Sequence, residues 1–312
     1  MKTEAVEFLS GGDTVRGDLY LPEGSGPFPT IVMAGGWCYV KELRQPDYAK
    51  EFVANGFAAL IFDYRRLGAS EGEPRQHLDP WDQIEDYKNA ISFLETLPVV
   101  DADRIGAWGI SYSGGHVLIL GATDPRVKCV VSNVPVVDGW ETMWRAQGSV
   151  KFRELRNTIL EDRRNRFVKG EYGYLAMSAE TYEVLSTWPF EEVTTGFEEL
   201  KRTQAPAHEH HSTIASTELL MDYTVFPYVK RLVDTPTLMV VAEEDDITMW
   251  DLELQAFNDI TTPTKRRVVL PKTTHMTLYS DVSALEVAAK VAARWFDEHL
   301  KQPLTFERLL EG

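Results

Sequence analysis

The amino-acid sequence predicts an α/β fold with a doubly wound, mostly parallel sheet and an inserted helical cap. Three observations support this. Short apolar runs recur without polar alternation, as expected for parallel strands buried on both faces. Segments with helical spacing of apolar residues separate these runs. This alternation stops near residue 138 and resumes near residue 229, which predicts a core over 1–137 and 229–312 with an insertion at 138–228.

The first half of the chain shows a regular succession of expected strands and helices. The expected strands cover residues 5–10, 14–21, 30–34, 57–62, 104–108 and 127–132, and the expected helices cover residues 48–55, 80–97 and a stretch from near Gly114. The first two strands flank Gly11-Gly12-Asp13, which is typical of a hairpin. Asp79 and Pro80 have the residue types preferred at the N-cap and first position of a helix.

The second half starts with the insertion, where charged and aromatic residues predict helices and little or no sheet. The strand–helix alternation then resumes, with strands expected at 237–241 and 266–270 and helices at 250–258 and 282–300. Aromatic side chains are frequent in the insertion: Trp140, Trp144, Tyr172, Tyr174, Tyr182 and Trp188. We expect the insertion to cover the mouth of the core and to select the substrate.

Composition excludes several classes of function. The 312 residues are 44% hydrophobic, enough for one large core with an insertion. A net charge of −16 argues against nucleic-acid binding, because phosphate backbones require basic surfaces. No apolar run approaches the roughly 18 residues of a membrane span, and the N-terminus does not resemble a signal peptide. With only two cysteines, Cys38 and Cys129, the chain is expected to be cytoplasmic.

Residues 104–116 carry the clearest chemical signal. A short strand leads into a sharp turn with Ser111 at its apex, and an apolar helix follows, which is the geometry of a nucleophile elbow. Gly109 and Ser113, two positions to either side, are small enough for this strained turn. An ordinary glycine-rich turn is the alternative. A frame with Ser113 as nucleophile would place the apex too far from the strand end.

Three stretches, residues 30–42, 63–75 and 109–115, make the chain resemble the α/β-hydrolases. Within that superfamily it is similar to the dienelactone-hydrolase-like and X-Pro-dipeptidyl-peptidase-like serine hydrolases. The resemblance covers nearly the whole chain. It implies a Ser-His-acid triad that needs no metal or organic cofactor.

The resemblance places the acid and the base of the triad after later strands. The turn after strand 237–241 contains Asp245, which matches the family's acid, with Asp246 and then Glu243 as alternatives. The alternative is that this stretch is a solvated acidic turn with no catalytic role. His275 follows the last core strand, where the family has its catalytic histidine. The acid would hold the histidine in the tautomer that accepts the serine proton.

Acyl transfer also needs N–H donors for the developing oxyanion. The backbone N–H of Tyr112, directly after the nucleophile, is one candidate. The second is the N–H of Trp37, with Cys38 next, although this chain has Gly35-Gly36 where relatives usually carry His-Gly. The mechanism would pass through an acyl-enzyme.

The expected substrate is a small molecule: a carboxylic ester or lactone with an apolar or aromatic group. Residues predicted to contact it are Cys38, Tyr39, Trp140 and Trp144. Hydrolysis of a C–C bond in a diketone-type compound, amide or peptide cleavage, and a catalytically inactive binding protein remain alternatives. A homodimer is possible. His208, His210 and His211 raise the question of zinc, but a cap loop facing solvent accounts for them better.

Overall fold

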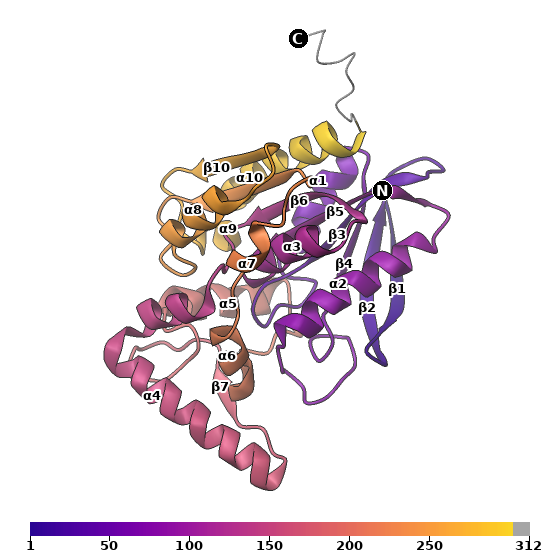
Figure 1. The fold of residues 1–312 in the computed structure, drawn as a ribbon. Coiled ribbons are helices and arrows are strands. Elements are labelled where there is room, and N and C mark those ends of the chain that lie inside the picture. The colour runs from indigo at the N-terminus through magenta and orange to yellow at the C-terminus, as the bar shows by residue number, and fades with distance from the viewer. Residues whose placement is uncertain (302–312) are drawn as a thin grey trace.

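The computed structural model describes residues 1–301 and contains one eight-stranded sheet (Figure 1). Its strand order is β1-β2-β4-β3-β5-β6-β9-β10. The strands are β1 (Lys2–Ser10), β2 (Asp13–Leu21), β3 (Phe28–Ala34), β4 (Ala58–Phe62), β5 (Val100–Ile110), β6 (Val127–Asn133), β9 (Thr237–Ala242) and β10 (Lys265–Leu270). Strand β2 pairs antiparallel with both β1 and β4, and every pairing from β4 to β10 is parallel. The predicted fold class is therefore confirmed.

Helices cover both faces of the sheet, as a doubly wound fold requires (Figure 1). On one face α2 (Pro80–Glu95) packs against α3 (Tyr112–Thr123), and on the other α1 (Gln45–Ala54) packs against α10 (Val282–Phe296). The carboxylate of Asp79 accepts hydrogen bonds from the N–H groups of Trp81 and Asp82, which confirms it as the α2 N-cap. Helix α8 (Trp250–Asp259), α9 (Thr277–Ser280) and a π-helical turn (Asp297–Lys301) complete the second half of the core.

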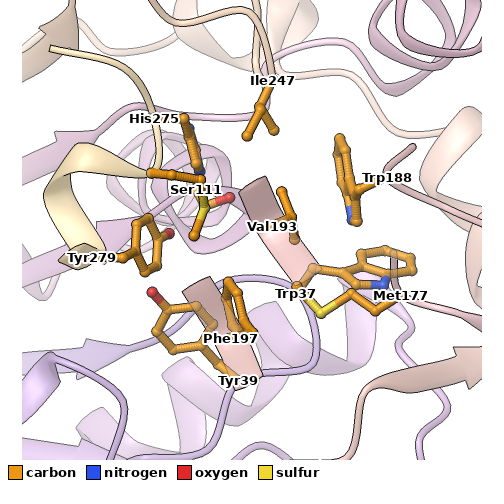
Figure 2. A pocket seen from close by; sticks show the side chains of 11 residues that line it. Trp37, Tyr39, Ser111, Met177, Trp188, Val193, Phe197, Ile247, His275 and Tyr279 are labelled. Carbon is orange, nitrogen blue, oxygen red and sulfur yellow. The ribbon is translucent and has the colours of Figure 1, made fainter. Parts of the chain in front are cut away.

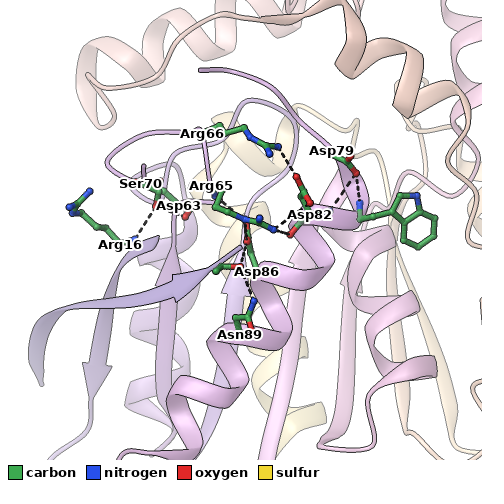
Figure 3. A network of polar contacts seen from close by, with 11 residues as sticks. Arg16, Asp63, Arg65, Arg66, Ser70, Asp79, Asp82, Asp86 and Asn89 are labelled. Carbon is green, nitrogen blue, oxygen red and sulfur yellow. Dashed lines mark hydrogen bonds and ion pairs between the residues drawn. The ribbon is translucent and has the colours of Figure 1, made fainter. Parts of the chain in front are cut away.

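The loop between β4 and α2 is held by buried charges (Figure 3). The Asp86 carboxylate, on α2, accepts hydrogen bonds from the N–H and Nε of Arg65 at 3.0 and 2.6 Å. At the start of the loop, Asp63 accepts from the N–H groups of Lys41 and Ala69 at 2.6 and 2.9 Å. Because Lys41 lies in the segment after β3, this loop anchors that segment from the side of the sheet.

The chain between β6 and β9 forms a region outside the sheet (Figure 1). It contains α4 (Gly139–Lys169), β7 (Tyr174–Ala176), α5 (Glu191–Thr203), β8 (His211–Thr213), α6 (Ile214–Met221) and α7 (Phe226–Val229). Helix α4 is kinked at Gly148, where φ is +62°, and its C-terminal half extends away from the sheet. The short strands β7 and β8 pair antiparallel, which sequence analysis did not anticipate because three-residue strands carry no recognisable alternation.

A small core of its own holds the outer part of this region together. It consists of Leu155 and Ile159 from α4 with Leu175 from β7. Helix α6 packs against α4 and completes this arrangement. Within residues 1–301, no helix has both the length and the apolar composition that crossing a lipid bilayer would demand.

Candidate functional site

Ser111 occupies a strained turn between β5 and α3. Its backbone has φ +59° and ψ −121°, a conformation that non-glycine residues rarely adopt. A Cβ atom added to Gly109 would lie 2.2 Å from the carbonyl oxygen of Ser113, so only glycine fits there. Ser113 is fully buried: its Oγ accepts from the N–H of Ile110 at 2.9 Å and donates to the carbonyl of Ala34 at 2.7 Å. Ser113 therefore braces the turn from inside, while Ser111 stands at its apex.

Asp245 and His275 meet because their strands are parallel neighbours. Asp245 follows β9 and His275 follows β10, and the two strands pair in parallel. The Nδ1 atom of His275 lies 2.8 Å from Oδ2 of Asp245, and both residues are buried. The alternatives face elsewhere: Asp246 is exposed, and exposed Glu243 accepts from the N–H of Lys272.

Asp245 is saturated with hydrogen bonds. Its Oδ1 accepts from the N–H groups of Ile247 and Thr248 at 3.0 and 2.9 Å. Its Oδ2 accepts from the Thr248 hydroxyl at 2.9 Å, beside His275. Four donors favour the ionised carboxylate. On the other side of the histidine, the Tyr279 ring stacks on the imidazole with centroids 5.5 Å apart and restricts its rotation.

Ser111 and His275 line one cavity, which contains about 290 Å³ of empty space, part of it open to solvent (Figure 2). The other walls are almost entirely apolar: Trp37, Tyr39, Met177, Trp188, Val193, Phe197, Ile247, Met276 and Tyr279. Figure 2 shows Ser111 and His275 together on one side and Trp37, Met177 and Trp188 on the other. Within residues 1–301 no hydrogen bond joins Ser111 to His275, a contact that commonly tightens only when substrate binds.

The loop after β3 passes directly over the nucleophile. A Cβ atom added to Gly36 would come within 2.9 Å of Ser111 Cβ and 3.2 Å of its Oγ. The N–H of Trp37, next in this loop, and the N–H of Tyr112, at the first turn of α3, have no acceptor in the part of the chain that the structure describes. Their side chains pack together with ring centroids 5.2 Å apart. Both predicted oxyanion donors are thus adjacent to Ser111 in the fold.

Cys38 was predicted to contact substrate, but its side chain is directed away from the cavity. The residue is buried with φ +55°, and its thiol donates to the carbonyl of His211 at 3.4 Å. Burial raises the pKa of the thiol, which disfavours the nucleophilic thiolate. Tyr39, by contrast, lines the cavity as expected.

Of the histidine cluster, His208 is buried, His210 is half-buried and His211 is partly exposed, so the expectation of a loop facing solvent is wrong for His208. Nδ1 of His208 lies 3.0 Å from the carbonyl of Cys38, and its Nε2 lies 3.1 Å from Nδ1 of His210. Nε2 of His210 lies 2.7 Å from the Ser178 hydroxyl. Burial lowers the pKa of His208 to about 3 and that of His210 to about 4. Among residues 1–301, no three His, Cys, Asp or Glu side chains are grouped to bind a metal.

Trp140 and Trp144, which were predicted to contact the substrate, do not line the cavity that contains Ser111. Trp140 is 45% exposed and Trp144 is 42% exposed, and each ring packs against Phe152 with centroids 5.2 Å apart. They lie on the first turns of α4, whereas the part of the cavity wall that the insertion contributes comes from the connection between β7 and α5 and from α5 itself. Of the aromatic residues noted in the insertion, only Trp188 lines the cavity within the described structure.

The geometry agrees with what comparison with known proteins finds. The model of the X-Pro dipeptidyl-peptidase (S15) family matches residues 11–277. The chain belongs to this family. The resemblance inferred from the sequence motifs is thereby confirmed.

Proteins similar to this chain carry several names. The chain is 39% identical to the quorum-quenching protein AidA of Acinetobacter baumannii (strain MDR-ZJ06), over 51% of this chain and 52% of AidA. The chain therefore spans about half the length of AidA. It is 31% identical to the thiohydrolase apmlB of Arthrinium phaeospermum, over 78% of this chain and 80% of that protein.

Solved structures confirm the fold. The α/β-hydrolase GrgF from Penicillium sp. sh18 is 25% identical and superposes with a TM-score of 0.81, over 96% of this chain and all of GrgF. A dienelactone hydrolase from Anabaena variabilis ATCC 29413 superposes with a TM-score of 0.59 at 18% identity, over 96% of this chain and 98% of that one. The second likeness concerns the fold alone. The protein is thus an α/β-hydrolase of the S15 family.

Proposed function

We propose that this protein is a serine hydrolase in which Ser111, His275 and Asp245 act as a catalytic triad. His275 removes the proton from the Ser111 hydroxyl as Oγ attacks a carbonyl carbon, and Asp245 holds the imidazole and balances its charge. The N–H groups of Tyr112 and Trp37 bind the oxyanion. His275 then gives its proton to the leaving group, and water repeats the cycle on the acyl-enzyme. Only protein groups are needed.

One observation carries this proposal: the buried 2.8 Å contact between His275 Nδ1 and Asp245 Oδ2, in the same cavity as Ser111 at the apex of the elbow. An inactive binding protein would have no need for this arrangement. The strained backbone of Ser111 points in the same direction, because strain of this kind persists where function requires it.

The substrate we propose is a carboxylic ester or lactone with an apolar or aromatic acyl group. The cavity supports this, because its walls offer large apolar surfaces from Trp37, Met177, Trp188 and Phe197 and no charged side chain beyond the triad. A sugar or phosphate would leave its polar groups without partners there. The name thiohydrolase borne by apmlB makes a thioester a related candidate. We further propose that residues 138–228 act as a cap over this cavity.

Covalent labelling with a fluorophosphonate probe tests the triad. We expect the native protein to be labelled at Ser111 and the variant Ser111→Ala to be unlabelled and inactive but folded, since one hydroxyl contributes little to packing. Ser113→Ala is the matched control and should still be labelled at Ser111. Labelling that maps to Ser113 or Cys38 would contradict the proposal.

A panel of substrates decides the bond type. Matched esters, thioesters, lactones, amides and β-diketones with the same phenyl or alkyl acyl group should be compared by kcat/KM. We expect the oxygen esters, lactones or thioesters to be cleaved fastest and charged acyl groups slowest. Preferential cleavage of the β-diketones or amides would assign the protein to the alternative classes.

A further inference from the structure

A second buried carboxyl group lies behind the proposed triad and is not used by the mechanism above. Glu253, on α8, is fully buried. The hydroxyl oxygen of Thr248 lies 2.8 Å from Oε1 of Glu253 and 2.9 Å from Oδ2 of Asp245. It also lies 3.3 Å from Nδ1 of His275. Glu253, Thr248, Asp245 and His275 thus form one continuous chain of contacts.

The hydroxyl group of Thr248 contacts two carboxyl groups but has only one proton to donate. A threonine hydroxyl has a single proton, so Thr248 can donate to only one of the two carboxyl groups at a time. If both carboxyls were ionised, one of the two short O···O contacts would join two acceptors. In that pair the Thr248 hydroxyl oxygen would face a carboxylate oxygen with no proton between them, and two buried negative charges would contact the same hydroxyl. One of the two carboxyls therefore carries a proton.

The hydrogen-bond partners decide which one. Asp245 accepts from the N–H groups of Ile247 and Thr248 and from His275 in addition to the Thr248 hydroxyl. Glu253 has no other donor in the described structure, and its Oε2 has no partner at all. The ionised form is thus favoured at Asp245 and disfavoured at Glu253.

We propose that Glu253 is protonated and acts as a positioning residue for the triad: its carboxyl O–H donates to Thr248 Oγ1, and the Thr248 O–H donates to Asp245 Oδ2. This inference rests on the proposed function. The chain runs in one direction, satisfies each donor, and fixes the Asp245 carboxylate against His275. It also leaves a single negative charge behind the imidazole.

The surrounding charges agree with a neutral Glu253. Burial raises the pKa of Glu253 well above its ordinary value, and the nearby negative charge of Asp245 raises it further. The ionisable groups that act on this part of the site are Asp245 and Asp251 near Glu253, and Glu192 near His275. Arg145 forms an ion pair with Asp251 at 2.8 Å and so is directed to that carboxylate.

The protonation state of Glu253 matters for the base. A second buried negative charge close to His275 would favour the imidazolium, the form that cannot accept the proton of Ser111. With Glu253 neutral, Asp245 is the one buried carboxylate that contacts His275, and the imidazole is free to accept the proton of Ser111. The extra proton on Glu253 is therefore what keeps a two-carboxylate site compatible with general-base catalysis.

The first test measures the rate of fluorophosphonate inactivation against pH, since its acid limb reports protonation of the essential base in the free enzyme. Glu253→Gln has the same shape, is neutral, and retains an N–H donor for Thr248. We expect its acid limb to lie within about 0.3 pH unit of that of the native protein. A downward shift of about one unit or more would show that a negative charge had been removed, and would overturn the proposal.

Two further variants test the positioning role. Glu253→Met and Thr248→Val each break the chain while preserving size, and we expect each to lower the inactivation rate about 3- to 10-fold, as the loss of one neutral hydrogen bond implies. Glu253→Gln and Thr248→Ser should restore most of the rate. Rates equal to native in both chain-breaking variants, with native far-UV circular dichroism, would contradict a positioning role.

An infrared difference spectrum between the native protein and Glu253→Gln at neutral pH tests the proton without any catalysis. We expect the C=O band of a protonated carboxyl group in the native protein and its loss in the variant. A carboxylate band in its place would overturn the proposal even if the probe labels Ser111. A native protein that is not labelled would instead contradict the proposed function, while the infrared band would still decide the protonation of Glu253.

Discussion

The sheet region and the inserted region contribute to the candidate site in different ways. Ser111, Asp245 and His275 all follow strands of one parallel sheet, so their loops converge at the same edge by topology. In residues 138–228 no such rule operates: Trp188 and Phe197 reach the cavity, whereas Trp140 and Trp144 face solvent. The sheet therefore positions the candidate catalytic side chains, while the irregular packing of the insertion forms part of the cavity wall.

The two regions meet at the loop after β3. From the sheet side, the Asp63 carboxylate accepts from the N–H of Lys41 at 2.6 Å. From the side of the insertion, His208 contacts the carbonyl of Cys38 at 3.0 Å. The segment that contains the proposed oxyanion donor Trp37 is therefore supported by both regions. Variants in each region therefore test whether the sheet region and the inserted region have these separate roles.

The largest effect is expected within the sheet region, at Asp245. We expect Asp245→Asn to lower kcat about 10²- to 10⁴-fold, because the imidazole loses both its tautomer constraint and its counter-charge. Exposed Asp246 supplies the matched control, and Asp246→Asn should change kcat far less. Steady-state kinetics on the best substrate of the panel provides the measurement. The reverse ranking would move the acid by one residue.

The next effect is expected at Gly36, where the sheet region closes over the nucleophile. We expect Gly36→Ala to lower kcat/KM about 100-fold, because the added methyl would come within 2.9 Å of Ser111 Cβ and displace either the loop or the nucleophile. The free energy of unfolding, measured with denaturant, should change much less than activity. An active variant would show that this loop does not form the oxyanion site.

A smaller effect, on selectivity, is expected in the inserted region. We expect Trp188→Ala to change kcat/KM about 5- to 100-fold between short and long acyl groups, because it removes a large apolar wall of the cavity. Trp144→Ala is the matched control and should leave this ratio nearly unchanged, since its ring packs on Phe152. Probe labelling of Ser111 should persist in both variants. Equal effects would contradict the assignment of the cavity walls.

The smallest effect concerns stability at the boundary between the regions. We expect His208→Phe to cost about 1–3 kcal/mol of unfolding free energy near pH 7.5, because the Cys38 carbonyl loses its donor. Since the folded pKa of His208 is about 3, below the roughly 6.5 of the unfolded chain, the unfolded state binds the proton that the folded state excludes. His208 therefore destabilises the native protein as pH falls through 6.5.

The phenylalanine variant has no such group, so its deficit relative to the native protein should shrink on acidification. Near pH 5 the difference should be about 2 kcal/mol smaller than near pH 7.5. Urea denaturation at both pH values measures it. A deficit that is the same at both values would show that His208 is protonated in the folded protein.

The fold class and the candidate catalytic residues that follow the strands could be predicted from the amino-acid sequence. Apolar runs identify buried strands, and small residues around Ser111 identify a tight turn, because both depend on local pattern. Asp245 and His275 were predicted through the family resemblance, which matches them to the positions that follow the strands expected at 237–241 and 266–270. The Asp79 N-cap followed from neighbouring residues.

Only the tertiary structure decided what surrounds these residues. Nothing in the local sequence distinguishes Trp188, which lines the cavity, from Trp144, which faces solvent, because their burial depends on how irregular loops pack. The same holds for His208, which is buried against the loop after β3 rather than exposed. Glu253 likewise is an ordinary acidic residue of an amphipathic helix until the fold places its carboxyl behind Thr248. Burial and long-range contact, rather than residue type, determine the role of such side chains.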